Sequence, residues 1–262
     1  LWYNSSAYVW RYQFPAVTTS GSWRTQVSIN NTRQGLRGSG IYTAALAIGG
    51  DNPGSSPEYL DFVETWNGSA WTEVNDLNQA RRFLGASGTT TSTLAFGGGE
   101  PPTLYNNTET WNGTNWTEVN NLNSARERLG GAGVDSTSAL AFGGSDPSNK
   151  NETELWNGSS WTEVNNLNTT KRELAGYGIA TAALAVGGYS TTALSETETW
   201  NGTNWTEVNN LNTARYDLQG SGTTTSSLVY GGSTGSITNK TELWNGTNWF
   251  EQNDLNLARS QA

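Results

Sequence analysis

The stretch WNGTNW at residues 111–116 belongs to a repeated phrase, Trp-Asn-Gly-x-x-Trp, that decides how this chain folds. The phrase occurs at residues 66–71, 111–116, 156–161, 200–205 and 244–249. Its second Trp recurs at steps of 45, 45, 44 and 44 residues. A period this regular indicates one supersecondary unit that is stacked on copies of itself.

Each copy of the phrase is typical of a β-hairpin. Asn-Gly adopts positive φ at little cost, so it predicts a tight turn between two Thr- and Trp-rich strands. The sequence therefore predicts a positive φ at the glycine of every copy, namely Gly68, Gly113, Gly158, Gly202 and Gly246.

Length and charge narrow the class of protein. The 262 residues would suit one or two domains. Because the repeat runs nearly from end to end, we expect one domain, with an N-terminal strand or closure segment at residues 1–21 and the repeat array at 22–262. The net charge of −9 repels nucleic acid phosphates, and no apolar run approaches the ~20 residues of a membrane-spanning helix. We expect neither a nucleic acid partner nor membrane insertion.

The sequence contains no Cys, no His and no Met. Disulfides, thiol nucleophiles and Cys/His zinc sites are therefore excluded, and so is general-base chemistry by histidine. We expect no catalytic residue, no cofactor and no metal site.

Every complete unit has the same order of segments. A Gly- and Thr-rich segment such as residues 85–91 precedes a short apolar strand such as Leu94–Phe96, which ends in Gly-Gly. A loop of variable length follows, then the two Trp-bearing strands, and Asn-x-Leu-Asn-x-Ala-Arg leads into the next unit. Four short strands in about 45 residues is the size of one β-propeller blade. No stretch has sustained helical periodicity, so the predicted fold class is an all-β propeller of four-stranded blades.

The start of the array bears on how the ring closes. Trp23 lies 26 residues before Gly49-Gly50, the offset that Trp71 has from Gly97-Gly98, so Trp23 is a sixth copy of the second Trp without a hairpin before it. We predict six blade positions, of which five are complete repeats and one is a composite of residues 1–28 and the C-terminal tail 255–262. The alternative is a five-bladed ring with residues 1–28 packed outside it.

The Gly-Gly after the second strand, the aromatic-then-Trp hairpin and the Arg after it resemble the kelch repeat over residues 22–259. The two aromatics are five residues apart here, closer than in ordinary kelch blades. The phrase WNGTNWTEVNNLN at residues 111–123 is also similar to kelch-like arrays in structural or tail proteins of marine bacteriophages. WD40 repeats are the structural alternative, but their Gly-His and Trp-Asp signatures are missing.

Two glutamates flank each hairpin symmetrically, two residues outside its tryptophans. The pairs are Glu64/Glu73, Glu109/Glu118, Glu154/Glu163, Glu198/Glu207 and Glu242/Glu251. Like charges directly opposite each other destabilise a sheet mildly, so something must relieve them. Calcium is one interpretation. Exposure to solvent on outer strands is the other, and we expect it, because a calcium site takes six or more oxygens.

Basic residues and tryptophans recur in the same register. The basic positions are Arg33, Arg81, Arg126, Lys171, Arg215 and Arg259. They form either a ring of cations around an anionic ligand or ties between blades, and we expect ties because Arg makes fixed multi-donor contacts. Most tryptophans of the hairpin pairs are expected in the core, with a sugar-stacking platform as the alternative. The second members of the pairs, expected as structural positions, are Trp71, Trp116, Trp161, Trp205 and Trp249.

The segment between Gly-Gly and Trp-Asn-Gly differs most between units. These loops are residues 51–61, 99–107, 145–150, 189–195 and 233–239, and all follow the same strand, so we expect them on one face of the disc. Loops on a rigid scaffold commonly carry binding residues, and neutral drift is the alternative. The first two loops are the longest and rich in proline, which lowers the entropy lost on ordering. The predicted binding positions are Pro53, Tyr59, Pro101, Tyr105 and Tyr189.

These observations predict a propeller that binds or assembles without catalysing a reaction. The resemblance to phage proteins implies an adhesion or structural module associated with a virion tail or fibre. Its partners would be other virion or surface proteins, or a glycan, in a virion or extracellular location. A secreted or surface lectin is the first alternative and a glycoside-processing enzyme the second. Copper oxidases with kelch-type propellers need His and Cys, and sialidase-type propellers need an Arg cluster with Asp and Tyr; neither set stands out here.

Overall fold

The computed structural model describes residues 2–4, 9–11 and 21–260. Every element in these ranges is a β-strand, as the sequence predicts. No helix long and apolar enough to cross a membrane is found among these residues. Strands β1 (Trp2–Asn4) and β2 (Val9–Arg11) pair antiparallel with each other. The rest of the predicted closure segment, at residues 1, 5–8 and 12–20, lies outside the described residues.

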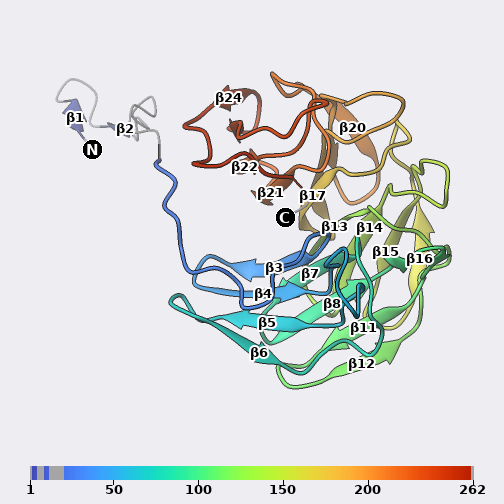
Figure 1. Ribbon diagram of the computed structural model, residues 1–262. Helices are drawn as coiled ribbons and strands as arrows, with labels where there is room; N and C mark the ends of the chain where they lie inside the picture. Colours follow the sequence, from blue (N-terminus) through green and yellow to red (C-terminus); the bar gives the residue numbers. More distant parts are fainter. Residues whose placement is uncertain (1, 5–8, 12–20, 261–262) are drawn as a thin grey trace.

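Five antiparallel sheets of four strands form a β-propeller (Figure 1). Blade 1 consists of β3 (Arg37–Ile41), β4 (Ala44–Ile48), β5 (Val63–Trp66) and β6 (Trp71–Val74). Blade 2 consists of β7 (Gly85–Thr89), β8 (Ser92–Phe96), β11 (Thr108–Trp111) and β12 (Trp116–Val119), with the ribbon β9 (Gly99–Glu100) and β10 (Thr103–Leu104) in its loop. Blade 3 consists of β13 (Gly130–Asp135), β14 (Ser138–Phe142), β15 (Thr153–Trp156) and β16 (Trp161–Val164). Blade 4 consists of β17 (Ala175–Ile179), β18 (Ala182–Val186), β19 (Thr197–Trp200) and β20 (Trp205–Val208). Blade 5 consists of β21 (Gln219–Gly222), β22 (Ser227–Tyr230), β23 (Thr241–Trp244) and β24 (Trp249–Glu251).

The Gly-rich first strands lie at the centre of the ring, where successive blades come closest. β3 packs on β7, β7 on β13, β13 on β17, and β17 on β21. A Cβ at Gly176 would lie 2.7 Å from the backbone nitrogen of Gly131 in the neighbouring blade, so only glycine permits this approach. The first strand holds this place, because the second strand carries the larger side chains that fill the space between blades.

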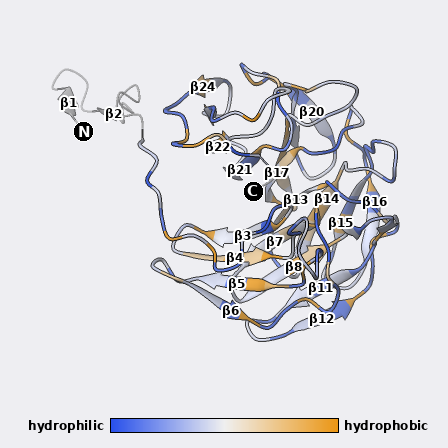
Figure 2. Ribbon diagram, in the orientation of Figure 1, coloured by the Kyte–Doolittle hydropathy of each residue, from blue (hydrophilic) through white to orange (hydrophobic). Residues whose placement is uncertain are grey.

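The hydrophobic core lies between neighbouring blades. One cluster joins Leu94 and Phe96 of blade 2 to Trp156 and Trp161 of blade 3, all buried. Phe96 meets Trp161 edge-on, with ring centroids 5.0 Å apart. Figure 2 shows the hydrophobic colour along the second strand β4 and in part of β5. Each blade therefore depends on its neighbour to bury its face, as the repeat predicts.

The hairpins confirm the predicted glycine conformation but use a different turn. Gly113 has a φ of 93°, and the glycines of the other four phrases lie between 92° and 94°. Trp111 pairs directly with Trp116, so the loop has four residues. Asn112 itself has no positive φ. Its Oδ1 accepts hydrogen bonds from the backbone N–H groups of Thr114 and Asn115, both at 2.9 Å. The asparagine closes the loop as an acceptor.

The ring has five blades, and the predicted composite sixth blade is not formed within the described residues. Residues 21–33 contain no strand, and no ladder joins Trp23 to a blade. Blades 1 and 5 are neighbours around the ring, yet β3 and β21 are not packed together as the other first strands are. Residues 21–36 pass between these two blades in Figure 1. The structure therefore has the five blades of the alternative, but residues 21–36 lie in an open junction between blades 1 and 5 instead of outside the ring.

Candidate binding face

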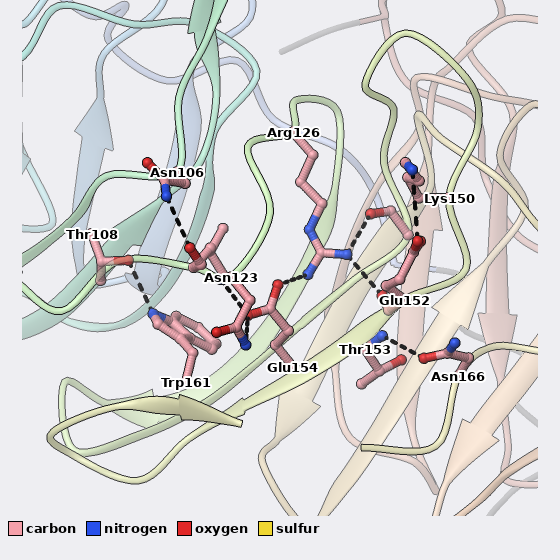
Figure 3. Close-up of polar contacts among 12 residues, drawn as sticks. Asn106, Thr108, Asn123, Arg126, Lys150, Glu152, Thr153, Glu154, Trp161 and Asn166 are labelled. Carbon is pink, nitrogen blue, oxygen red and sulfur yellow. Dashed lines mark hydrogen bonds and ion pairs between the residues drawn. The ribbon is translucent and has the colours of Figure 1, made fainter. Parts of the chain in front are cut away.

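A buried ion pair ties each complete blade to the next. Arg126 leaves blade 2, and its Nη2 lies 2.9 Å from Oε1 of Glu154 on β15 of blade 3 (Figure 3). Its Nη1 donates to the carbonyl of Glu152 at 2.9 Å. Asn123 donates its backbone N–H and its side-chain amide to Glu154 Oε2, both at 2.8 Å. The equivalent pairs are Arg33–Glu64, Arg81–Glu109, Lys171–Glu198 and Arg215–Glu242.

These ion pairs are closed to any ligand. The basic side chains are 0% exposed and their glutamates at most 2%. Burial lowers the pKa of Arg126 from its ordinary value, and the charge of Glu154 opposes that shift. Removing one member of such a pair leaves the other charge buried and typically costs about 3–5 kcal/mol. Four of these basic residues tie one blade to the next, and Arg33 ties the segment before blade 1 to that blade. None of the five is open to an anion.

The glutamate pairs differ from the expected pattern. The register places Glu109 opposite Glu118, as expected. However, Glu109 is buried in the ion pair, and only Glu118 is exposed. The expected solvent exposure is thus correct for the outer member of each pair and wrong for the inner one. The basic side chain of the preceding link, an arginine or, for Glu198, Lys171, relieves the repulsion. Within residues 2–4, 9–11 and 21–260, no group of three or more carboxylates is placed to hold a metal ion.

The tryptophans of blades 2 to 5 are core residues. Trp116, Trp161, Trp205 and Trp249 are 5–6% exposed. Trp161 also donates its indole N–H to Oγ1 of Thr108 in the preceding blade, at 3.0 Å (Figure 3). Rings held in this way do not form a platform for stacking sugars. Trp71 of blade 1 differs, because it is half-buried at the open junction.

The links between blades place four non-glycine residues in a left-handed conformation. We call the following residues the axial ring: Gly35 (φ 63°), Phe83 (53°), Arg128 (59°), Glu173 (58°) and Asp217 (53°). From Phe83 to Asp217, each donates its backbone N–H to the carbonyl of the preceding member, at 2.7–2.9 Å. The conformation costs a non-glycine residue about 1–2 kcal/mol, and such strain clusters at functional sites.

The variable loops share a face with the axial ring. Antiparallel bridges join each link to the loop of the same blade: Gln34 to Asp51, Arg82 to Gly99, Glu127 to Ser145, Arg172 to Tyr189 and Tyr216 to Ser233. The loops therefore lie on one face, as predicted, and the links complete it. The link positions were not among the predicted binding residues. The sequence does contain a signal for them. The two-residue combination that follows the basic residue is different in every unit, although the sequence around it is repeated.

A continuous strip of arginine and aromatic contacts crosses this face. Arg82 lies over the rings of Tyr59 and Phe83, with its Cζ 5.4 Å and 4.9 Å from their centroids. Arg128 lies 3.9 Å from the centroid of Phe83 and forms an ion pair with Glu173. Arg172 contacts Glu173 at 3.2 Å and lies 5.0 Å from the ring centroid of Tyr189. Tyr189 meets Tyr216 edge-on at 5.2 Å.

The predicted binding residues are distributed unevenly on this face. Tyr59 and Tyr189 belong to the arginine–aromatic strip. Tyr105 lies apart from it, where its hydroxyl donates to Glu100 Oε2 at 3.2 Å. Burial and that carboxylate raise the pKa of Tyr105. Pro53 and Pro101 are exposed at the loop tips.

The opposite face has a different character. Exposed apolar side chains lie at the turns between first and second strands of blades 1, 3 and 4; they are Ile41, Tyr42, Val134 and Ile179, between 41% and 90% exposed. Scattered exposed apolar residues are ordinary on protein surfaces. This face provides control positions for experiments on the strip.

The fold and this face define a β-propeller with a repeated structural frame and one chemically varied face. No family model and no curated protein matches the sequence. The propeller class therefore rests on the strands themselves.

Proposed function

We propose that this chain is a non-catalytic binding propeller, an adhesion or assembly module of a phage virion tail or fibre, and that it docks through the arginine–aromatic strip. The observation that carries the proposal is the unbroken series of contacts from Tyr59 to Tyr216 across blades 1 to 5. Arg and Tyr are enriched at protein interfaces and among their hot spots. The phage setting draws on the resemblance of the repeated phrase to kelch-like phage arrays.

The chemistry of the face favours binding over catalysis. The inner glutamates of the frame are committed to ties between blades. Glu173, the carboxylate within the strip, is occupied by ion pairs to two arginines. Planar guanidinium groups stacked on aromatic rings are pre-ordered for contact with a partner's carboxylates or aromatic side chains.

The test exchanges contact residues while sparing the frame. Tyr59→Ala combined with Tyr189→Ala should leave folding intact and reduce incorporation into particles or adsorption to host cells by tenfold or more. Exchange of residues 52–58 and 100–104 for the short loop of blade 5 should weaken binding in the same assay; it spares Asp51, which is buried and paired with Arg82. Tyr42→Ser on the opposite face is the matched control. If the folded strip variants bind as the unaltered protein does, the contact face lies elsewhere.

A lectin is the alternative function, and the half-buried pair Tyr189 and Tyr216 favours it, because paired tyrosines beside Arg172 can stack on a sugar ring. A glycan array separates the two functions. Binding to a defined glycan that Tyr216→Ala abolishes would assign the face to a sugar, whereas protein capture from disrupted particles would assign it to a virion partner.

A further inference from the structure

The open junction between blades 5 and 1 is a sixth blade position whose outer edge is already occupied. Trp23 meets Tyr230 of blade 5 edge-on, with ring centroids 5.2 Å apart and an interplanar angle of 64°. Trp161 meets Phe96 in the same way, at 5.0 Å and 64°. Trp23 therefore stands against blade 5 as the outer Trp of a following blade would.

Hydrogen bonds on both sides of residues 21–33 repeat those of a complete blade. Asn253 donates to the carbonyl of Gly21 at 3.2 Å, as Asn209 donates to that of Thr247 at 3.0 Å. On the other side, the backbone N–H of Asn30 donates to Glu64 Oε2 at 2.7 Å, and Arg33 pairs with Glu64 at 3.0 Å. This segment is bonded to both neighbours as an outer strand and its link would be, while none of the other described residues forms the three strands that would lie inside it.

Several groups at the junction lack the partner that their equivalents have. In blades 2, 3 and 4 a buried threonine at the start of the third strand accepts from the indole of the next blade; these pairs are Thr108–Trp161, Thr153–Trp205 and Thr197–Trp249. Thr241 holds this place in blade 5, but its Oγ1 is buried without a hydrogen bond. The indole of Trp23 donates instead to the carbonyl of Asn253, at 3.0 Å.

Arg259, the sixth residue at the basic position, has no carboxylate partner among the described residues, unlike its equivalents. The backbone of Arg259 is placed like that of Arg215, since Gly232 donates to its carbonyl at 2.8 Å as Gly188 does to Arg215 at 3.0 Å. Its side chain, however, is exposed, and no carboxylate of the described residues lies within ion-pair distance. Residues 1–20 contain no Asp or Glu, and Ala16 has the sequence place of Glu64, seven residues before the Trp. The N-terminal segment thus has no carboxylate for Arg259.

We propose that this position binds an extended, acidic β-strand of a partner protein. The strand adds antiparallel to residues 23–26 and places a carboxylate on Arg259 and Asn256. The register follows from blade 1, where Trp66 pairs with Trp71 and Glu64 with Glu73, so the carboxylate stands opposite Thr25.

The walls of the position suit such a strand. A cavity of about 510 Å³ reaches from the axis to the junction and is lined there by Ile29, Ala45, Ala47, Trp71 and Tyr230. A strand presents alternate side chains to opposite faces, so its apolar residues meet these walls while main-chain hydrogen bonds supply affinity. The site is separate from the arginine–aromatic strip, and either one can fail without the other.

The probe is a fluorescent peptide of residues 106–112, Asn-Asn-Thr-Glu-Thr-Trp-Asn, which is the third strand of blade 2. It should bind the 262-residue chain, and Arg259→Gln should weaken binding by about tenfold or more, as expected for loss of a charged pair. Glu109→Gln in the peptide should have the same effect, and the two changes together should cost little more than one. Lys150→Gln, which removes one positive charge from blade 3, is the control.

The absence of cysteine allows the register to be read directly. Arg24→Cys should form a disulfide with the peptide carrying Thr110→Cys, because those positions are directly opposite, whereas Gln26→Cys should not. The proposal is overturned by any of three results: no peptide binding at about 1 mM, equal binding by Arg259→Gln, or equal crosslinking of both cysteine variants. Self-association that Arg259→Gln abolishes would assign the position to a second copy and also overturn it.

Discussion

Trp161 donates its indole N–H to Thr108 Oγ1 across the boundary between blades 2 and 3, at 3.0 Å. Between blades 1 and 2 this contact is missing, because Val63 stands where the other blades have threonine, and Trp116 Nε1 is buried without a partner. A buried unsatisfied donor costs about 1–3 kcal/mol. Val63→Thr should therefore stabilise the protein by about 1 kcal/mol, measured by chemical denaturation.

The reverse change at another boundary provides the control. Thr153→Val removes the acceptor of Trp205 and should destabilise the protein by about 1–3 kcal/mol. If both substitutions leave the denaturation midpoint unchanged, the indole contact does not contribute to the stability of the ring.

Alkaline stability should depend on Tyr177. Its hydroxyl is 3.0 Å from Ser227 Oγ, across the boundary between blades 4 and 5. Burial raises the pKa of Tyr177 well above its ordinary value of about 10. The folded state thus resists forming the phenolate, so this contribution to stability is complete below about pH 10 and is lost as the pH rises further.

The substitution that isolates this effect is Tyr177→Phe. It should cost about 1 kcal/mol at neutral pH, through the lost hydrogen bond, and make the loss of stability above about pH 10 shallower. Urea denaturation at a series of pH values measures both quantities. Tyr42→Phe, at a site that is 90% exposed, should change neither. An unaltered alkaline slope in Tyr177→Phe would contradict the assignment.

The hairpin glycines are required for their conformation and not for space. A Cβ at Gly113 would meet nothing closer than Thr91 at 3.6 Å, but φ there is 93°. Gly113→Val should therefore cost about 1–2 kcal/mol through backbone strain. Gly21, with open space and no positive φ, is the matched control. Equal melting temperatures for the two valine variants would show that the loop tolerates a side chain.

The blade could be predicted from the sequence because its signals are local. The steps between tryptophans, the Gly-Gly after the second strand and the Trp-Asn-Gly turn all act within a few residues of where they are read. The burial of Glu109 could not be predicted in this way. Its partner Arg81 comes from the previous unit, so the hairpin alone shows two carboxylates in opposition and no cation.

The axial ring was beyond sequence reasoning for a different reason. Phe83, Arg128 and Glu173 are residue types that rarely adopt positive φ, and nothing in their neighbours indicates it. The conformation is imposed by the series of hydrogen bonds from the N–H of one link to the carbonyl of the preceding one, which forms only when the blades are assembled side by side. Variability after each basic tie was visible, but it did not indicate that these positions meet at the axis.

A substitution at Glu173 in the axial ring tests partner binding and stability separately. It is half-buried in a left-handed conformation that asparagine adopts more readily than glutamate does. Glu173→Asn loses the ion pairs to Arg128 and Arg172, but the side chains of these arginines are 21% and 31% exposed and remain in contact with water, and the substitution relieves backbone strain of about 1–2 kcal/mol. The melting temperature should therefore change little. Partner binding should fall by tenfold or more, because the substitution interrupts the arginine–aromatic strip at its middle. Glu118→Asn, on an exposed outer strand, is the control for the lost charge. A Glu173→Asn variant that folds and binds normally would show that the strip is structural, and the proposed docking face would then be wrong.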